Sequence, residues 1–325
     1  MVVDGCSGVK ISVCVPVYDV KPHYLASLLA SVAAQNYSDY EVIIGDDCSQ
    51  VDYTDTLAQF SEPAKLQYAR NAVNIGMVAN WNRTVARATG DVGIVLGHDD
   101  VIAPGMFATY VGAFMESDAT VLVSSGSGFI DEEGLACEFR TNVNHRSNIF
   151  IDCPRYDLNG REVSRLCLRN GSAIGELSVQ MFRLSAFRAT GGYDPQFRHA
   201  ADADLAIRVA DRGTTVYLNS PFLLRRMHSD NLTWRHLAEG NITADRARLF
   251  EKHHGRHSFT TKEIAQFKAY LVACACYDVM RLPRHRSVRT MAKAFAQMPR
   301  YATAWVPAYI AALAEIVSRR NLDAR

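Results

Sequence analysis

The chain has 325 residues, of which 48% are apolar and 21% are charged. These proportions are typical of a soluble globular protein, and they exclude a disordered chain, a collagen-like repeat and a polytopic membrane protein. The net charge of +1 excludes a chain that attracts nucleic acid through its overall charge, so we expect no nucleic-acid partner.

The charge is distributed unevenly along the chain. Residues 281–325 contain nine Lys or Arg and two acidic residues, so this tail carries +7, while residues 1–280 have 26 basic and 32 acidic residues and carry −6. The asymmetry predicts a body that holds the chemistry and a basic tail with different surroundings.

The eight cysteines form no CxxC pair, and the N-terminus has no basic region followed by an apolar stretch of signal-peptide length. We therefore expect free thiols and a cytoplasmic location.

The first 125 residues alternate β-rich runs with helical patterns. The strands are predicted at 10–17, 40–45, 66–70, 91–97 and 120–124, and the helices at 25–32, at 76–88 and from Pro104 onward. The pattern predicts a mostly parallel α/β sheet with flanking helices, in which ligands gather at the carboxyl ends of the strands.

The rest of the chain becomes increasingly helical. Residues 126–183 predict hairpins, a helix near 157–168 and a strand at 177–182, and later helices are predicted at 201–212, 241–254, 261–281, 285–297 and 301–318. We divide the chain into a catalytic domain over 1–232 and a basic helical extension over 233–325.

Asp99 and Asp100 directly follow the apolar run 92–97 and precede a helix. Carboxylates at the ligand edge of a sheet are hard oxygen ligands that can hold Mg²⁺ or Mn²⁺ against a diphosphate. A turn in which one Asp caps the helix is the alternative.

A second acid pair, Asp46 and Asp47, ends the strand at 40–45. Two strand ends that carry acid pairs would converge on one crevice, where an acid can bind ribose hydroxyls or a base N–H. Their convergence favours a nucleotide site.

Asp202 shares a helical stripe with Leu205, Ala206 and Val209, whereas Asp204 can pair with Arg208 at i+4. An inward carboxylate among apolar neighbours is a candidate general base. A helix N-cap is the alternative for Asp202.

Several motifs follow one another in order along the chain: Ile11–Tyr18, Glu41–Ser49, Asn74–Gly76 with Asn80–Asn82, Gly90–Asp91, His98–Asp100, Phe182–Arg183, Gly191–Asp194, Ala201–Leu205 and Arg226–His228. Together these motifs resemble family 2 nucleotide-sugar glycosyltransferases over about residues 10–232. The resemblance implies a GT-A fold, with a nucleotide-sugar half over about 10–125 and an acceptor half over about 126–232. It also implies a divalent cation, Mn²⁺ or Mg²⁺, and inversion at the anomeric carbon.

The resemblance also implies roles for single residues. Pro16, Tyr18 and Asp47 are expected to line the nucleoside pocket, with Asp47 meeting the base, and Gly76 and Asn80 belong to the same sugar-donor site. Asp99 and Asp100 match the metal and diphosphate motif, and Asp202 matches the catalytic base. His228 falls where a histidine approaches the metal, and Gly175 and Glu176 where the acceptor loop lies; a packed histidine and an ordinary loop are the alternatives.

Two positions depart from the family pattern. Gly97 stands where a further acid often precedes the metal motif, and Ala201 stands where an acid usually precedes the base. We therefore expect the cation to rest mainly on Asp100, the diphosphate and water.

The predicted function is transfer of a sugar from a nucleoside diphosphate sugar to a hydroxyl of a saccharide or lipid-linked saccharide, in the synthesis of a cell-surface polysaccharide or glycolipid. A non-catalytic binding subunit of the same fold and a nucleotidyltransferase are the alternatives.

Residues 301–318 are largely apolar and precede Arg319 and Arg320. They predict either peripheral docking on anionic lipid or packing on protein, including a homodimer interface.

Overall fold

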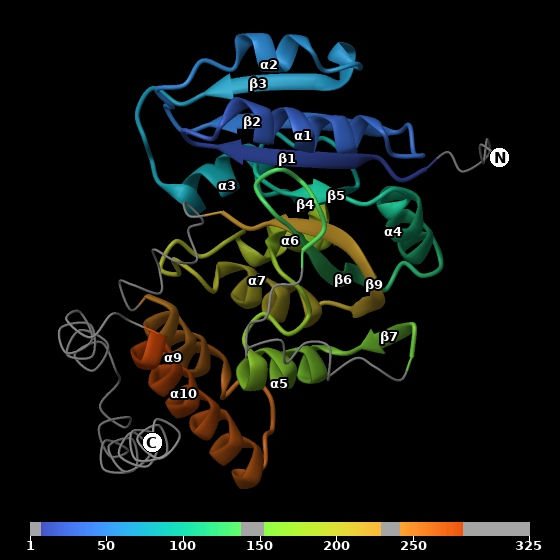
Figure 1. Cartoon of the computed structure of the whole chain (residues 1–325). Coiled ribbons are helices and arrows are strands. Elements are labelled where there is room, and N and C mark those ends of the chain that lie inside the picture. The colour runs from blue at the N-terminus through green and yellow to red at the C-terminus, as the bar shows by residue number, and fades with distance from the viewer. Residues whose placement is uncertain (1–7, 138–152, 229–240, 282–325) are drawn as a thin grey trace. The chain divides into compact units, whose positions relative to one another are not determined.

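The computed structural model describes residues 8–137, 153–228 and 241–281 (Figure 1). They fall into two compact units. The larger unit comprises the described residues of Met1–Cys167, Ser172–Phe197 and Ala201–His228, and the smaller one those of Leu168–Gly171, Arg198–Ala200 and Ser229–Arg325.

The larger unit is built on one sheet with the strand order β3-β2-β1-β4-β8-β6-β9-β5, and β7 pairs with β9. The strands are β1 Ile11–Val17, β2 Tyr40–Asp46, β3 Leu66–Arg70, β4 Val92–Val95, β5 Val101–Ile102, β6 Thr120–Ile130, β7 Arg155–Leu158, β8 Met181–Arg183 and β9 Thr214–Arg226. The helices are α1 Pro22–Ala33, α2 Thr54–Ala58, α3 Met77–Val85, α4 Met106–Met115, α5 Gly160–Asn170, α6 Leu184–Thr190, α7 Ala201–Ala210, α9 Asn241–His253 and α10 Thr261–Arg281.

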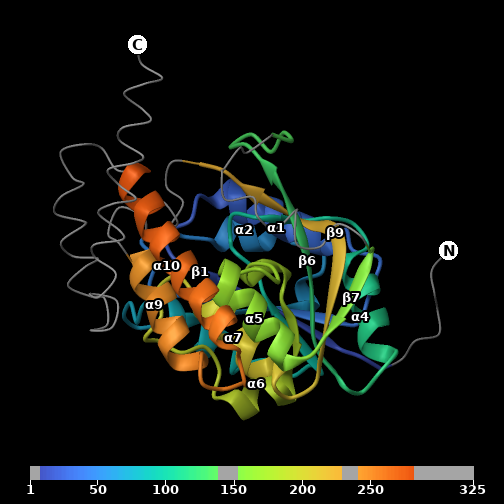
Figure 2. The same ribbon diagram turned by 90° about the horizontal axis from the view of Figure 1, so that it is seen from below.

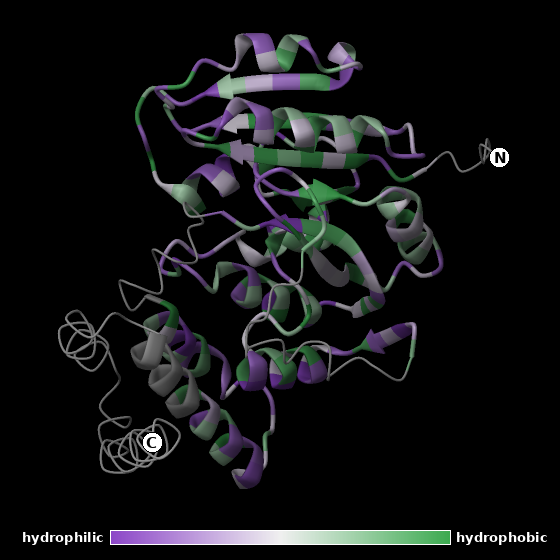
Figure 3. Cartoon of the chain, in the orientation of Figure 1, coloured by the Kyte–Doolittle hydropathy of each residue, from purple (hydrophilic) through white to green (hydrophobic). Residues whose placement is uncertain are grey.

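The first half of the sheet is parallel, as predicted. β3, β2, β1 and β4 are parallel neighbours, and their register pairs Val17 with Asp46 at the carboxyl ends of β1 and β2. Figure 1 shows the arrowheads of β1, β2 and β3 on the same side. Every residue of β1 is buried, and its ribbon is largely green in Figure 3. A continuous apolar run of this kind is typical of a strand covered on both faces.

The second half of the sheet is mixed, so the prediction of a mostly parallel sheet was too simple there. β8 is antiparallel to β4 and β6, and β5 and β7 are antiparallel to β9. Only β9 and β6 are parallel neighbours in this half, and Figure 2 shows β6, β9 and β7 side by side. The α/β class itself, with flanking helices, is confirmed.

β9 was missed by the sequence reasoning. Its run contains Asn219 and Pro221, which interrupt a strand pattern. The strand is irregular at that point: between the pairs Ser125–Leu218 and Gly126–Pro221, β9 advances three residues while β6 advances one. This bulge breaks the alternation from which a strand is predicted.

Two predicted boundaries shift for local reasons. The helix expected from Pro104 begins at Met106, because Gly105 precedes it in a left-handed conformation with φ of 82°. The strand expected at 177–182 divides into a 3-10 turn at Leu177–Val179 and β8 at Met181–Arg183.

The core of the larger unit lies between the sheet and its helices. The predicted apolar stripe of α1, Leu25, Leu28, Leu29 and Val32, is fully buried in it.

In the smaller unit, α9 and α10 confirm the helices predicted at 241–254 and 261–281. Asp245 of α9 accepts hydrogen bonds from the main-chain N–H groups of Arg198, His199 and Ala200, at 2.6, 2.6 and 3.2 Å. The helices predicted at 285–297 and 301–318 lie outside the described residues.

In the described part of the chain, the helices are too short or too polar to cross a membrane.

Candidate active site

Three loops of the larger unit lie at one edge of the sheet, because they follow the carboxyl ends of the parallel neighbours β2, β1 and β4. Tyr18 follows β1, Asp47 follows β2, and Asp99 with Asp100 lies beyond β4. The two acid pairs predicted from the sequence therefore share the ligand edge of the sheet.

Asp46, the first acid of its pair, is used inside the fold. It is fully buried, and its carboxylate accepts hydrogen bonds from the Ser49 hydroxyl at 2.6 Å, the Tyr68 hydroxyl at 2.6 Å and the Arg70 guanidinium at 3.0 Å. A buried charge with three such partners holds the turn after β2 in place.

Asp47, the second acid, is 2% exposed and organises the loop before α3. Its carboxylate accepts hydrogen bonds from the Asn71 amide at 2.9 Å and from the main-chain N–H groups of Ile75 and Gly76 at 2.8 and 2.9 Å. The Asn71 amide also donates to Asn80 at 3.1 Å. Three predicted sugar-donor residues, Asp47, Gly76 and Asn80, thus belong to one hydrogen-bonded cluster.

Pro16 and Tyr18 differ in exposure. Pro16 is buried within β1, whereas the Tyr18 side chain is 51% exposed just beyond the end of the strand. The next residue, Asp19, has φ of 48° and accepts a hydrogen bond from the Gln50 N–H at 2.6 Å, which ties the loop after β1 to the loop after β2. Of these residues, Tyr18 offers an aromatic face to a ligand.

Asp99 lies beside two histidines. The His228 Nε2 atom is 2.9 Å from Asp99 Oδ2, and the His98 Nδ1 atom is 3.9 Å from Asp99 Oδ1. Burial alone raises the pKa of Asp99, but the hydrogen bond with His228 and the charges of both histidines outweigh it and lower the pKa to about 2. Asp99 is therefore ionised at neutral pH.

Asp100 has the opposite tendency. Its carboxyl accepts hydrogen bonds from the Ser178 hydroxyl at 3.0 Å and the Arg226 main-chain N–H at 3.3 Å. Burial and the negative charge of Asp99 raise the pKa of Asp100 to about 8. Two neighbouring carboxyls that cannot both ionise easily make a position where positive charge binds favourably.

Glu176 and Arg225 form an ion pair next to these acids. The Arg225 Nη1 atom, on β9, is 2.7 Å from Glu176 Oε1. The negative charge of Glu176 raises the pKa of Arg225; burial opposes this rise, and the charges of Asp100 and Asp99 add to it. Gly175, the other predicted acceptor-loop residue, has φ of 102°, and a Cβ there would lie 2.4 Å from the Val179 side chain. The loop therefore requires glycine.

Asp202 lies near the start of α7 and is 7% exposed. Its Oδ2 atom accepts a hydrogen bond from the Ser172 hydroxyl at 3.1 Å, and its Oδ1 atom accepts one from the Ala203 N–H at 2.8 Å. Asp204 instead forms the predicted pair with Arg208, at 2.6 Å. The two acids of α7 thus have different partners, as the helical spacing indicated.

Segment 172–178 connects these features. Ser172 contacts Asp202, Glu176 contacts Arg225, and Ser178 contacts Asp100. The structure thereby joins the candidate base to the acid pair through seven consecutive residues. Sequence reasoning placed only Gly175 and Glu176 of this segment in the site, and serine is too common in turns to signal such a role.

The donor chemistry of this cluster fits a hard divalent cation. Asp99 and Asp100 supply carboxylate oxygens, and His228 supplies an imidazole in contact with Asp99. Among the residues that the structure describes, no three His, Cys, Asp or Glu side chains are already gathered as a complete metal site. A cation here would accordingly take part of its coordination from a ligand and water.

Known proteins resemble this chain in sequence. Residues 12–152 match the model of the glycosyl transferase family 2. The abequosyltransferase RfbV of Salmonella typhimurium is 31% identical over 181 residues, which are 52% of this chain and 51% of RfbV. The chondroitin synthase of Pasteurella multocida is 24% identical over 227 residues, which are 70% of this chain and 22% of that protein. The chain thus spans about half of the length of RfbV and about a fifth of the length of the chondroitin synthase.

Solved structures show the same fold. The Staphylococcus aureus protein TarS, residues 1–349, solved in complex with UDP-GlcNAc, superposes with a TM-score of 0.62 at 13% identity, over 91% of this chain and 83% of that one. The mannosyltransferase PcManGT of Pyrobaculum calidifontis, in complex with GDP-Man and Mn²⁺, gives a TM-score of 0.58 at 16% identity, over 94% and 81% of the two chains.

Proposed function

We propose that this chain, in which residues 12–152 match the model of the glycosyl transferase family 2, transfers a sugar from a nucleoside diphosphate sugar to an acceptor hydroxyl, with inversion at the anomeric carbon. The observation that carries the proposal is segment 172–178, which links Asp202 to Asp100. A displacement at one carbon requires the base and the leaving-group site to be held at a fixed distance from each other, and one short segment that contacts both can do this.

In the proposed reaction, Asp202 acts on the acceptor. Its carboxylate accepts the proton of the acceptor hydroxyl while that oxygen bonds to the anomeric carbon. The bond between this carbon and the diphosphate oxygen breaks on the opposite face, and the diphosphate leaves with the electron pair. The hydrogen bond from Ser172 orients the Asp202 carboxylate for this transfer.

Asp99 and Asp100 act on the sugar donor. They would hold the divalent cation, with His228 fixing the orientation of Asp99. When bound, the cation supplies positive charge to the departing diphosphate. The complexes of TarS with UDP-GlcNAc and of PcManGT with GDP-Man and Mn²⁺ support a nucleoside diphosphate sugar and Mn²⁺ as ligands.

The nucleoside would lie against Tyr18, the exposed aromatic residue at the same sheet edge. Asp47, Gly76 and Asn80 would shape this pocket by holding the loop that precedes α3. The acceptor would approach past Gly175 and Glu176. The similarity to a chondroitin synthase and to an abequosyltransferase supports a saccharide acceptor in polysaccharide synthesis.

The first test measures sugar-donor binding by the full chain. Melting temperature is followed with UDP-, GDP-, dTDP- and CMP-sugars, each with Mn²⁺, Mg²⁺ or EDTA. One nucleotide class is expected to stabilise the protein only with the cation, by about 2.7 kcal/mol at a hundredfold excess over Kd. Asp100→Ala is expected to remove the effect. If none of the nucleotides stabilises the wild type, the proposed sugar-donor site is wrong.

The second test separates binding from chemistry. Asp202→Asn keeps the shape of the side chain but removes the base, so turnover should fall about 10²–10⁴-fold while sugar-donor binding persists. Asp118→Asn, at an exposed turn, serves as the matched control and should retain turnover. NMR of the product gives its anomeric configuration, and retention of the sugar-donor configuration would overturn the mechanism.

A further inference from the structure

Arg226, the last residue of β9, takes no part in the proposed chemistry and is only 4% exposed. Its Nε atom donates a hydrogen bond to the Asp99 carbonyl at 3.0 Å, and its main-chain N–H donates to the Asp100 carboxyl at 3.3 Å. Its Nη1 atom donates to the carbonyls of Asp131 and Glu132 at 3.1 and 2.9 Å. One residue thus contacts both acids of the candidate site and a distant turn.

The distant turn belongs to hairpin 129–137, which continues β6. Cys137 N–H donates to the Phe129 carbonyl at 3.0 Å, and Gly134 N–H donates to the Asp131 carbonyl at 3.1 Å, with Gly134 at φ of 89°. Arg226 therefore binds the same turn that the hairpin's own hydrogen bonds close.

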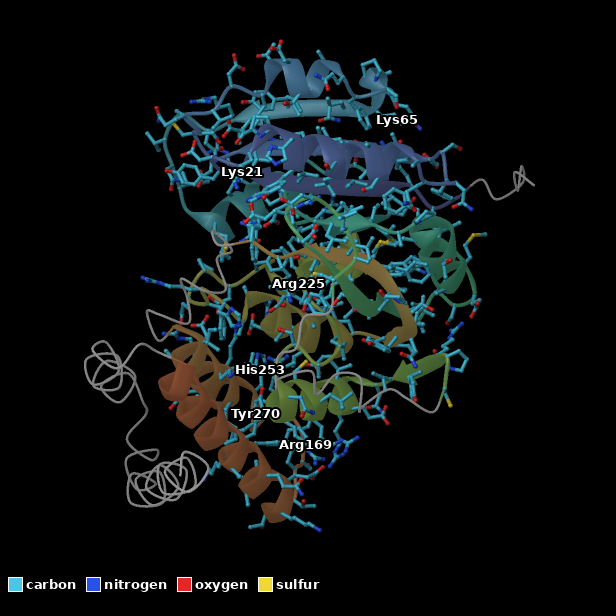
Figure 4. The ribbon with its side chains drawn as sticks, in the orientation of Figure 1. Lys21, Lys65, Arg169, Arg225, His253 and Tyr270 are labelled. Carbon is cyan, nitrogen blue, oxygen red and sulfur yellow. The ribbon has the colours of Figure 1, made fainter. Side chains whose placement is uncertain are left out.

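The guanidinium also packs on α1. Its central carbon lies 4.7 Å from the centroid of the Tyr24 ring, and Tyr24 is 2% exposed. Lys21, labelled in Figure 4, directly precedes α1, and its Nζ atom lies 3.6 Å from Glu132 Oε2, which forms a second link between the start of α1 and the hairpin. Arginine suits this position because its planar group can donate in several directions while it stacks on a ring.

Direct contact between Arg226 and a ligand is disfavoured by its burial and by the three carbonyls that its side chain already binds. Its effect on a ligand must pass through the acids that it holds.

We propose that Arg226 is a positioning residue, which fixes the turn of Asp99 and Asp100 to hairpin 129–137 and to α1 and so makes the hairpin a support of the sugar-donor site. The inference rests on the proposed function, because only a sugar donor and cation bound at these acids would bind more weakly when Arg226 is replaced.

The test compares Arg226→Lys with Arg183→Lys. Arg183 also binds three carbonyls, of Thr120 at 2.7 Å, Phe114 at 3.0 Å and Ser117 at 3.3 Å, but it pairs with Val92 at the opposite end of β4 from the acids. A lysine ammonium cannot span three separated carbonyls, so both variants should lose stability. Two readouts distinguish them: hydrogen exchange of residues 97–103 and 129–137, and the Kd of the preferred nucleoside diphosphate with Mn²⁺.

Arg226→Lys is expected to speed exchange in both segments and to weaken nucleotide binding about 10–100-fold, the usual effect of losing a residue that orients a metal ligand. Arg183→Lys should leave both readouts unchanged. Equal nucleotide affinity in the two variants, or unchanged exchange in the hairpin, would overturn the inference. If the wild type binds no nucleotide, the proposed function fails, while the exchange data still decide whether Arg226 holds the turn.

A second variant covers the case in which Arg226→Lys does not fold. Gly134→Ala strains the hairpin turn through its positive φ, while Gly191→Ala introduces a similar strain, at φ of 80° with open space around it, in another turn. Gly134→Ala should weaken nucleotide binding relative to Gly191→Ala. Equal affinities would contradict a supporting role for the hairpin.

Discussion

Asn82 holds the Tyr193 main chain through both of its polar groups. The Asn82 amide donates to the Tyr193 carbonyl at 2.7 Å, and its oxygen accepts a hydrogen bond from the Tyr193 N–H at 2.8 Å. Asn82 lies on α3, next to the parallel strands, and Tyr193 lies in the loop between α6 and α7. One side chain thus fastens the two halves of the larger unit.

Asn82→Ala should destabilise the larger unit. It leaves a carbonyl and an N–H of Tyr193 without these partners, at a cost of about 1–3 kcal/mol for each group that remains buried. Urea unfolding measures the loss. Asn74→Ala, which removes an exposed side-chain acceptor of the Gly76 N–H, is the control and should cost less than 1 kcal/mol; similar losses in the two variants would contradict the role of Asn82.

Gly192→Ala should be more harmful than Gly191→Ala. The two glycines have nearly equal φ, 78° and 80°, so backbone strain is matched. A Cβ at Gly192 would lie 2.6 Å from the Asn82 side-chain oxygen, whereas a Cβ at Gly191 meets nothing within 4 Å. The difference in unfolding free energy between the two variants therefore measures the cost of the clash between the new Cβ and Asn82. Equal unfolding free energies in the two variants would contradict the prediction, because they would mean that Asn82 moves away from the new Cβ at little cost.

Asp100 should make stability depend on pH. Its pKa is about 8 in the fold against 3.8 as a free side chain, so the unfolded chain gives up this proton first. Without cation, its ionisation therefore lowers stability progressively from about pH 4 to about pH 8. Asp100→Asn should melt at least about 2 °C above the wild type at pH 8, a shift that about 1 kcal/mol produces in a domain of this size.

The control for this prediction is the same comparison at pH 4, where the advantage of Asp100→Asn should disappear. An advantage that is constant between pH 4 and pH 8 would mean that the ionisation of Asp100 is not its source.

Ser172→Ala should change the pH dependence of turnover. The Ser172 hydroxyl donates to Asp202, and such a bond favours the ionised carboxylate that the proposed mechanism needs. Its removal should move the acidic limb of the kcat/KM profile to higher pH, while Ser172→Thr, which keeps a hydroxyl, should restore it. An unmoved limb in Ser172→Ala would separate Ser172 from the proton transfer.

The parallel half of the fold could be predicted from the sequence because each strand there is a short, uniform apolar run followed by a helical pattern. The spacing of the apolar residues Val13, Val15, Leu25 and Leu28 predicts both the strand or helix that they form and their burial in the core. The strand predicted at 177–182 forms only in part, as the three-residue β8, and β9, which was not predicted, is interrupted near Pro221. Signals this short or broken do not stand out before the neighbouring strands are known.

Candidate site residues could be proposed from the sequence where a residue's chemistry is visible in its local sequence, as for the acid pair Asp99–Asp100 and for Asp202 with its helical stripe. Ser172, Ser178 and Arg225 were missed because their roles depend on partners distant in the sequence, at Asp202, Asp100 and Glu176. The predicted roles of all the candidate site residues, Asp99, Asp100 and Asp202 included, stay predictions, and so does a peripheral membrane or dimer contact through 301–318.

The bulge in β9 determines which face of the strand each side chain after it occupies, and so which residues Arg225 and Arg226 contact. After it, residues 223–226 pair regularly with 127–130 of β6, and alternate side chains of a strand face opposite ways. Arg225 accordingly meets Glu176, while Arg226 binds the Asp99 carbonyl. Deleting one residue at Asn219 or Ser220 would move the side chains after it to the opposite faces of the strand, so that Arg225 would lose Glu176 and Arg226 would lose the Asp99 carbonyl. The length of this irregular stretch therefore sets the register of the end of β9, and with it which arginine faces which partner.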